Sequence, residues 1–448
     1  MTAQLPVEIW FLVCRFLVNK ADMTDLQNVT LTSGFFREIA QPLLFHTVKL
    51  YIHAEYGEVG NIVRWSRSTR FHRDFLGRMA FVSSPRVAPC IRRIVISLSR
   101  FEHFPPRGTG SVDADLLTHA LMRRVPSFVN LTRFKIQQCP IFGFVLRQLF
   151  ATPSLIKLTI HGSPISFDTS LLTAPPAFNL KFLRLRSITA HQSFYLKPWL
   201  KSLFSSPINH IDLEEGDCAT ALASFIASDP SFPSLPSLQA VTIGPCHTDV
   251  LDISGLLQKC PMLKALSLNG NGRITDTVPI PEGCVPLLCT LFGLWSQIEV
   301  YLRHPSIRNI FVRAITPSQA IPFLERVHFL RPELTNIKLS YSLTKDMDTQ
   351  VIKIALTRFR QLEEFTLNAT PDNEAFFDDA LDIFLTAIEL DLAPTLRKIL
   401  IGSSGWYRNQ PERIEKIDSG LMVSVQMKCP ALGHLCLRSS EMTREWVA

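Results

Sequence analysis

Residues 153–160 read Pro-Ser-Leu-Ile-Lys-Leu-Thr-Ile, in which Leu155, Leu158 and Ile160 are the aliphatic positions of a short phrase. Alternate residues of a strand share a face, so Leu158 and Ile160 should point inward together. The phrase occurs twelve times along the chain. The copies are 91–96, 131–136, 155–160, 180–185, 208–213, 238–243, 263–268, 307–312, 334–339, 362–367, 396–401 and 432–437. This recurrence predicts an array of stacked units.

A proline lies two positions before the first aliphatic residue in eight of the twelve copies. These prolines are Pro89, Pro153, Pro236, Pro261, Pro305, Pro332, Pro394 and Pro430. Proline cannot continue a helix and favours extended backbone before it. Each unit is therefore expected to be a helix, a stop and a strand, giving an α/β solenoid. An ordinary α/β domain with coincidental leucine spacing is the alternative, and the regular prolines disfavour it.

The phrase resembles the leucine-rich repeat, whose L-x-x-L-x-L pattern it matches from about residue 88 onward. The spacing averages about 31 residues, against roughly 20–29 in standard repeats. The asparagine expected after the strand is mostly missing, although Asn269 and Asn368 come close to its position. The better match is the irregular kind of repeat that accompanies F-boxes, which implies a curved, irregular solenoid.

Composition predicts a soluble cytoplasmic or nuclear protein. Apolar residues make up 46% of the 448 residues, and the ten cysteines include no CxxC pair, so a metal site has little support. The first residues lack the basic leader of a signal peptide. The apolar window 283–298 is too short to span a bilayer and contains Pro286, so no membrane association is expected.

No catalytic motif stands out. The chain has no P-loop, no HExxH and no GxGxxG after a strand, and residues 402–405 miss the GxSxG spacing. We therefore expect a binding protein that is not an enzyme and needs no cofactor or metal.

The first fifty residues differ from the array. Residues 5–18 form an apolar helical stretch, and two further short helices are expected near Leu26 and Phe36. Three short helices in roughly 40 residues cannot bury all of these side chains against one another. The excess apolar surface should be covered by a partner chain.

This segment resembles an F-box. The opening L-P-x-E-[IL] is matched by residues 5–9, the acid-Leu pair by Asp25-Leu26, the aromatic-basic step by Phe36-Arg37 and the closing Pro-Leu-Leu-Phe by residues 42–45. The usual V-S-[KR] is Val29-Thr30-Leu31 here. The resemblance implies docking to a Skp-type adaptor, and through it to a cullin-RING scaffold. The residues expected to dock are Leu5, Pro6, Ile9, Leu12, Phe16, Leu17, Leu26 and Val29. A solenoid cap is the alternative for this segment.

Together the two resemblances match fungal-type F-box/leucine-rich-repeat proteins. They imply an F-box at 1–50, a helical linker at 51–88 that packs onto the array, and about twelve solenoid units at 89–448. The implied function is the substrate-recognition subunit of an SCF-type E3 ubiquitin ligase, whose repeats bind a protein substrate. The alternative is a non-catalytic leucine-rich-repeat scaffold with no ubiquitin-ligase link.

Outward-facing basic residues in the early repeats are candidates for substrate binding. Arg93, Arg133, Lys135, Lys157 and Arg184 would form a basic stripe if the strands align. Such a stripe suits an acidic or phosphorylated segment, although a solvated strand face is the simpler interpretation.

Two other features are candidates for binding. Trp406, Tyr407 and Arg408 lie in an insertion and have the residue types that anchor interfaces. The eight arginines from Arg64 to Arg93 suggest nucleic-acid binding as a further hypothesis. Arg64, Arg67 and Arg70 are expected on one helical face. The net charge of +7 is too low to favour a polyanion.

Overall fold

The computed structural model describes a mixed α/β chain. The described residues are 6–19, 24–56, 63–65, 69–100, 114–139, 141, 143–163, 179–186, 206–214, 216–229, 232, 234–244, 250–251, 253–269, 276–277, 283–341, 350–368, 392–402, 413–416, 419–438 and 442–447. They form two compact units. The N-terminal unit comprises Met1–Ala221 and Ser231–Leu235, and the C-terminal unit comprises Leu222–Pro230 and Pro236–Ala448.

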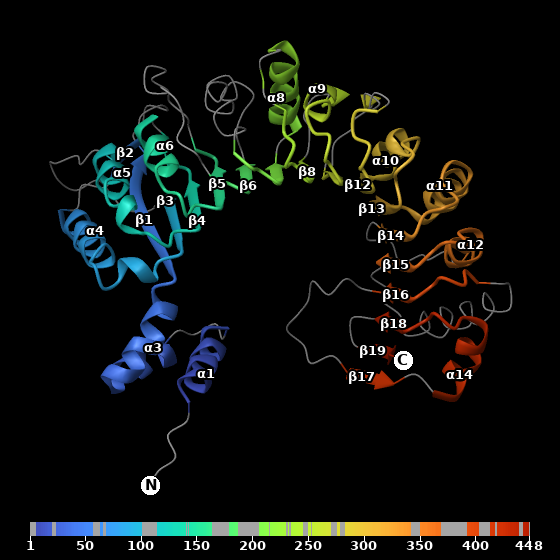
Figure 1. Cartoon of the computed structure of the whole chain (residues 1–448), viewed down its shortest axis with the longest axis horizontal. Helices are drawn as coiled ribbons and strands as arrows, with labels where there is room; N and C mark the ends of the chain where they lie inside the picture. Colours follow the sequence, from blue (N-terminus) through green and yellow to red (C-terminus); the bar gives the residue numbers. More distant parts are fainter. Residues whose placement is uncertain are drawn as a thin grey trace, which may run out of the picture. The chain divides into compact units, whose positions relative to one another are not determined.

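The N-terminal unit begins with three helices and continues as a sheet. The helices are α1 (Val7–Asn19), α2 (Thr24–Thr32), α3 (Gly34–Leu44), α4 (Thr69–Val82), α5 (Ala114–Met122) and α6 (Gly143–Phe150), with 3₁₀ turns at Ala88–Cys90 and Val125–Ser127. The strands are β1 (Thr47–Tyr56), β2 (Val63–Trp65), β3 (Arg93–Arg100), β4 (Arg133–Gln137), β5 (Lys157–His161), β6 (Phe182–Arg186) and β7 (His210–Leu213). Figure 1 shows α4, α5 and α6 on one side of these strands.

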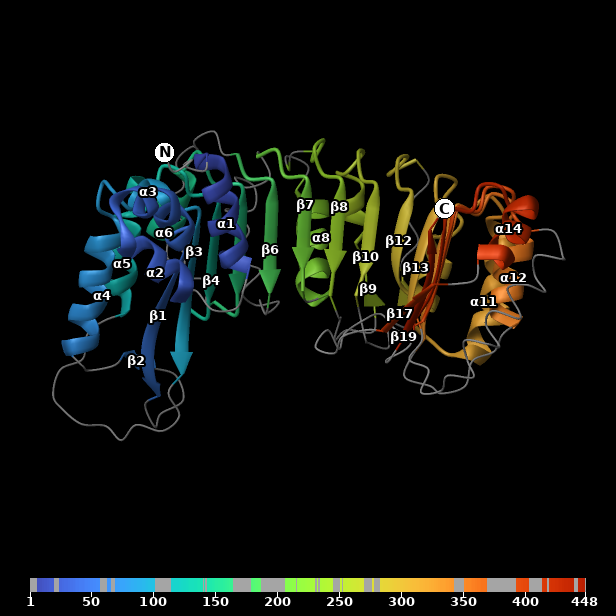
Figure 2. The same cartoon turned by 90° about the horizontal axis from the view of Figure 1, so that it is seen from below.

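The C-terminal unit repeats the strand-helix alternation. Its strands are β8 (Ala240–Ile243), β9 (Val250–Leu251), β10 (Ala265–Leu268), β11 (Asp276–Thr277), β12 (Thr290–Leu294), β13 (Asn309–Ile315), β14 (Asn336–Tyr341), β15 (Glu364–Asn368), β16 (Lys398–Gly402), β17 (Arg413–Lys416), β18 (His434–Arg438) and β19 (Met442–Val447). Its helices are α9 (Ser254–Leu257), α10 (Trp295–Tyr301), α11 (Pro317–Leu330), α12 (Gln350–Arg358) and α14 (Ser419–Lys428), and the division between the units falls within α8 (Gly216–Ser228). Figure 2 shows the strands of each unit along their length, running side by side.

Every copy of the repeated phrase contributes a strand, and equivalent positions are in register. Leu158 pairs with Phe134 on one side and Leu183 on the other, and β10 and β12 to β16 continue the same parallel pattern in the C-terminal unit. The described aliphatic and aromatic side chains of the phrase are at most 3% exposed. One strand per unit with its apolar face buried is a leucine-rich-repeat-like solenoid, as the sequence predicts.

The sheet also contains strands that the repeat pattern does not predict, β12 and β1 among them. β12 pairs with β10 and β13, but its third phrase position is Gly293 instead of an apolar residue. A Cβ at Gly293 would lie 3.1 Å from the carbonyl oxygen of Leu268, so the neighbouring backbone occupies that space. β1 pairs with β3 over Thr47 to Ala54. The array therefore begins within the segment expected to be F-box and helical linker.

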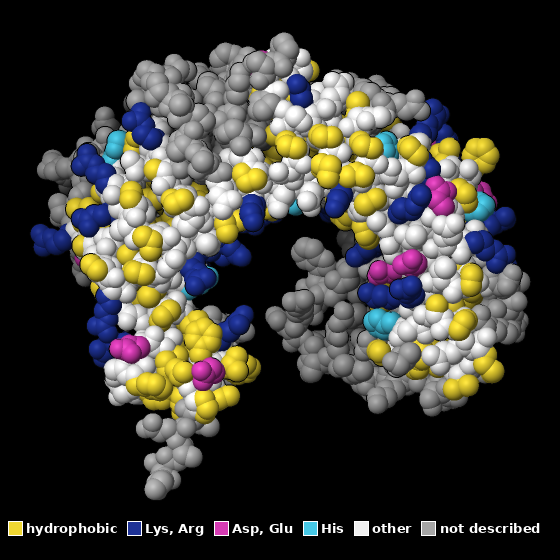
Figure 3. Space-filling view, viewed as in Figure 1, with side chains coloured by type: hydrophobic (Ala, Val, Ile, Leu, Met, Phe, Trp, Pro, Cys, Tyr) yellow, Lys and Arg dark blue, Asp and Glu magenta, His cyan; other side chains and the backbone are white. Residues whose placement is uncertain are grey.

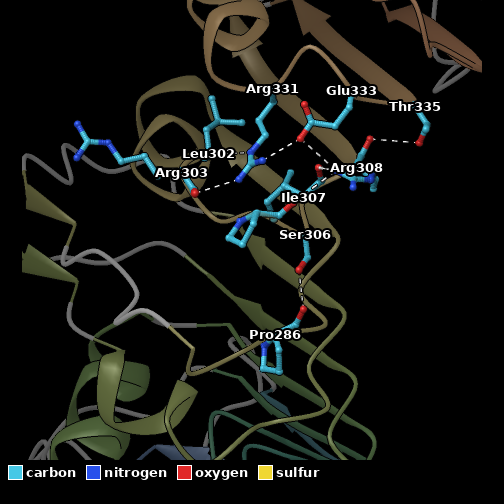
Figure 4. A network of polar contacts seen from close by, with 10 residues as sticks. Pro286, Leu302, Arg303, Ser306, Ile307, Arg308, Arg331, Glu333 and Thr335 are labelled. Carbon is cyan, nitrogen blue, oxygen red and sulfur yellow. Dashed lines mark hydrogen bonds and ion pairs between the residues drawn. The ribbon is translucent and has the colours of Figure 1, made fainter.

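A polar network connects two neighbouring repeats within the C-terminal unit (Figure 4). The Arg331 guanidinium donates to the backbone oxygens of Leu302 and Arg303 at 2.7 and 3.0 Å and to Glu333 at 2.8 Å. Arg308 donates to the same Glu333 oxygen at 3.2 Å. The carbonyls after α10 are thus held by a side chain of the next unit.

None of the helices in the described part of the chain is long and apolar enough to cross a membrane.

Candidate protein-binding surfaces

The three N-terminal helices enclose a small core of their own. Cys14, Leu26, Ile39 and Ala40 are buried at its centre, with Trp10, Val29, Leu43 and Leu44 packed around them. The rings of Trp10 and Phe36 meet edge to face with centroids 4.9 Å apart. The Ser33 hydroxyl accepts a hydrogen bond from the Phe36 N–H at 3.2 Å and caps α3.

Helix α1 is apolar on the opposite side as well. Ile9, Leu12 and Phe16 follow i, i+3, i+7 spacing, and their side chains are 41%, 56% and 63% exposed. Phe11 and Val13 widen this exposed surface. Hydrophobic side chains gather over the N-terminal helices in Figure 3. A helix that is apolar on both sides normally has both sides covered.

The residues expected to dock an adaptor separate into two groups. Pro6 is exposed and Leu17 is half-buried, so both adjoin the exposed stripe of α1. Leu26 is 0% exposed, and Val29 packs against the core cluster. Leu26 is therefore a core residue that a partner cannot reach, because α2 turns it toward α1 and α3. Leu5 lies outside the described residues.

Two further exposed apolar residues of the N-terminal helices were not among the residues predicted to dock. Leu31 is 75% exposed at the end of α2, and Phe35 is 49% exposed at the start of α3. Leu31 lies in the segment where the chain departs from the usual F-box pattern. We call Ile9, Leu12, Val13, Phe16, Leu31 and Phe35 the apolar docking surface.

The three N-terminal helices, α1 to α3, join the array directly. Helix α3 ends at Leu44 and β1 begins at Thr47, so two residues connect them. The Phe45 ring packs on Phe81 of α4 with centroids 5.4 Å apart. The His46 carbonyl accepts hydrogen bonds from the N–H groups of Arg92 and Arg93 at 3.1 and 3.0 Å. Within the range 51–88, where a helical linker was expected, residues 51–56 and 63–65 are strand and residues 69–82 form the helix α4.

The predicted basic residues do align on the exposed face of the N-terminal strands. Arg93, Arg133 and Lys157 occupy one row across β3, β4 and β5. Lys135 and Arg184 share the next row, two strands apart, with Thr159 between them. Lys and Arg side chains are visible on the strand side of this unit in Figure 3.

Acidic partners lie at one edge of these rows. Arg184 forms an ion pair with Asp212 of β7, and Arg186 pairs with Glu214 at 2.7 Å. The Lys157 Nζ lies 3.8 Å from the centroid of the Phe182 ring. Sequence reasoning missed Asp212, Glu214 and Arg186, because the pairs join residues 28 positions apart that only the strand register brings together.

The basic side chains depress one another's affinity for protons. Burial lowers the pKa of Lys135, and the charges of Arg186, Arg93 and Arg184 lower it further. Burial likewise lowers the pKa of Lys157, with Arg184 and Arg133 adding to the effect and Asp212 opposing it. The positive charge on this face is therefore incompletely neutralised.

The described residues show no assembled site for the other candidates. Trp406, Tyr407 and Arg408 lie outside the described residues. Arg64 lies in β2 and Arg70 in α4, so the expectation that they share a helical face with Arg67 is wrong; Arg67 itself is not described. Within the described ranges, no three His, Cys, Asp or Glu side chains are grouped to hold a metal ion.

Comparison with known proteins gives likenesses among solved structures alone. No family model matches the sequence, and no curated protein matches it. Among solved structures, the chain is similar to the crystal structure of the TLR13–ssRNA13 complex, with 14% identity and a TM-score of 0.41 over 80% of this chain and 43% of that one. The chain thus spans less than half the length of that protein. The parallel register of the strands and the burial of the repeated apolar residues establish the leucine-rich-repeat-like fold.

Proposed function

We propose that this protein is the substrate-recognition subunit of an SCF-type E3 ubiquitin ligase. In this proposal the apolar docking surface binds a Skp-type adaptor, which links the chain to a cullin-RING scaffold. The solenoid then holds a protein substrate near the conjugating enzyme and raises its effective concentration there. The chain itself makes or breaks no bond.

The observation that carries the proposal is the second apolar side of α1. The three helices already have a core, yet Leu12 and Phe16 remain 56% and 63% exposed. Burying one such side chain in an interface contributes about 1.5–3 kcal/mol. The match of residues 5–9 and 42–45 to the F-box pattern supports a Skp-type adaptor as the partner.

Co-purification of the full chain with a recombinant Skp-type adaptor tests this proposal. The wild type should form a stable complex on size-exclusion chromatography. Ile9→Asp and Leu12→Asp should weaken binding by at least about 30-fold, because each places a charge in a desolvated interface. Phe329→Asp is the matched control, since Phe329 of α11 is 84% exposed and lies in the other unit.

Unchanged adaptor binding by Leu12→Asp would show that the docking surface is assigned wrongly. If the wild-type chain does not bind the adaptor, the alternative of a repeat scaffold with no ligase link is favoured.

A further inference from the structure

The exposed strand face of the N-terminal unit carries a compact group of cations. Arg93, Arg133, Lys135 and Lys157 lie on three adjacent strands, β3, β4 and β5. Among the described residues, none of these four forms an ion pair within 4.0 Å, whereas Arg184 and Arg186 beside them do. We call these four residues the cation cluster.

Acidic side chains border the cluster at the β7 edge. Asp212 and Glu214 occupy the β7 edge, where they pair with Arg184 and Arg186. An anion approaching that edge meets like charge, whereas the described outward-facing side chains of β3 to β5 are cationic or neutral. Burial lowers the pKa of Lys135 and Lys157, and repulsion by neighbouring arginines lowers it further. A bound anion would relieve that repulsion.

The size of the cluster limits its ligand. Three adjacent strands span about 10 Å, at roughly 4.8 Å between neighbours. An extended peptide covers that distance with about three residues. Four positive charges match two phosphoryl groups, each carrying about −1.5 to −2 at neutral pH, or about four carboxylates.

We infer that the cation cluster binds a short, densely anionic segment of a protein, bearing two phosphates or about four carboxylates within three to four extended residues. The inference rests on the proposed function only in identifying that segment as part of a substrate. The cluster lies beside β1, which follows the docking helices after two residues. The bound segment would thus lie on the part of the array next to the adaptor-binding helices.

A peptide fits this face better than a nucleic acid. Single-stranded nucleic acid is held by basic grooves together with aromatic rings on which its bases stack. The Phe182 ring beside the cluster is already covered by Lys157 and stacks on His210 with centroids 4.5 Å apart. The acidic β7 edge also interrupts the long basic track that a phosphate backbone would need.

Fluorescence anisotropy with the full chain tests the inference. The first probe is a labelled Gly/Ser peptide with two phosphoserines three positions apart, and the second is the same peptide without phosphate. A third probe has four glutamates in place of the phosphoserine region, and the fourth is an oligouridine RNA. The phosphorylated or the glutamate peptide, or both, should bind more tightly than the neutral peptide, and added salt should weaken that binding.

Charge removal locates the site. The double substitution Arg133→Gln with Lys135→Gln should weaken binding about 100-fold, at about tenfold per charge-assisted contact. Arg123→Gln, in the turn after α5, removes an exposed arginine of the same unit and should have no effect. Circular dichroism and the melting temperature should match the wild type, because the substituted side chains are not part of the core.

The inference is overturned if the cluster substitutions leave peptide affinity unchanged, or if the neutral peptide binds as well as the charged ones. It is also overturned if oligouridine binds more tightly than either charged peptide and loses affinity in the same variant. Adaptor binding should survive the cluster substitutions, and phosphopeptide binding should survive Leu12→Asp. Loss of anionic-peptide binding can therefore be distinguished from loss of adaptor binding.

Discussion

At the scale of single residues, Glu333 shows how ion pairs hold the irregular units together. Partial burial raises the pKa of Glu333, but its backbone hydrogen bond and the hydrogen bond and charge of Arg331, with Arg308, outweigh burial and leave the pKa below its ordinary value. The carboxylate therefore stabilises the fold above the unfolded-state pKa, about 4.3. This contribution is lost as pH falls through the lower folded-state value.

Glu333→Gln should reduce the free energy of unfolding at pH 7 by about 1–3 kcal/mol. The difference from wild type should shrink below about pH 4, as measured by urea unfolding across pH. Glu325→Gln, on the exposed side of α11, should change little. A difference that persists at pH 3 would contradict the assigned role of the Glu333 charge.

Gly293 illustrates the opposite case, in which a missing side chain matters. A Cβ there would lie 3.1 Å from both the Leu268 carbonyl oxygen and the Gln297 Oε1. Gly293→Ala should therefore destabilise the protein by about 1–3 kcal/mol. Gly77→Ala in α4, where a Cβ meets nothing within 4 Å, should stabilise it by about 0.5–1 kcal/mol. Thermal melts of both variants check the contrast, and equal effects would refute it.

At the scale of elements, α1 has two apolar sides with separate roles. Trp10 and Cys14 face the helical core, and Leu12 faces outward. Trp10→Ala should lower the free energy of unfolding by about 2–3 kcal/mol. Leu12→Ala should change it by less than about 0.5 kcal/mol but should weaken adaptor binding. Chemical denaturation and adaptor titration of both variants measure the separation, which a large stability loss in Leu12→Ala would disprove.

At the scale of the whole molecule, the array is held by contacts between neighbouring strands. Leu158 of β5 is 0% exposed and pairs with β4 and β6. Leu158→Ala should cost about 3 kcal/mol and should speed hydrogen exchange in β4, β5 and β6. Strand β14 should keep its protection, because repeats interact mainly with their neighbours. Equal acceleration in β14 would indicate that the array unfolds as one cooperative block.

The sequence predicted most of the array because its signal is periodic and redundant. The aliphatic anchor and the alternation coincide in all twelve copies, and a proline precedes them in eight. The same pattern missed β12, whose Gly293 breaks the alternation, and β1, whose Val48 and Leu50 follow a helix with no intervening proline.

The sites were predicted less completely, because they depend on which side of an element a residue faces. Leu26 and Leu12 are both apolar helix residues, yet only the packing of three helices makes one buried and the other exposed. Similarly, Arg93, Arg133 and Lys157 could be aligned from the repeat alone. The pairing of Arg184 with Asp212 could not, because it depends on side-chain reach across the register.

The order of segments in the chain has a consequence for synthesis. Helices α1 to α3 end at Leu44, roughly 400 residues before the last repeat is made. At about 5–20 residues per second, a ribosome needs tens of seconds for that remainder. During this interval the exposed apolar side of α1 is already in solution, while the repeat array that follows it is still being synthesised. Binding of the proposed adaptor to the nascent chain on the polysome would therefore protect the protein from aggregation.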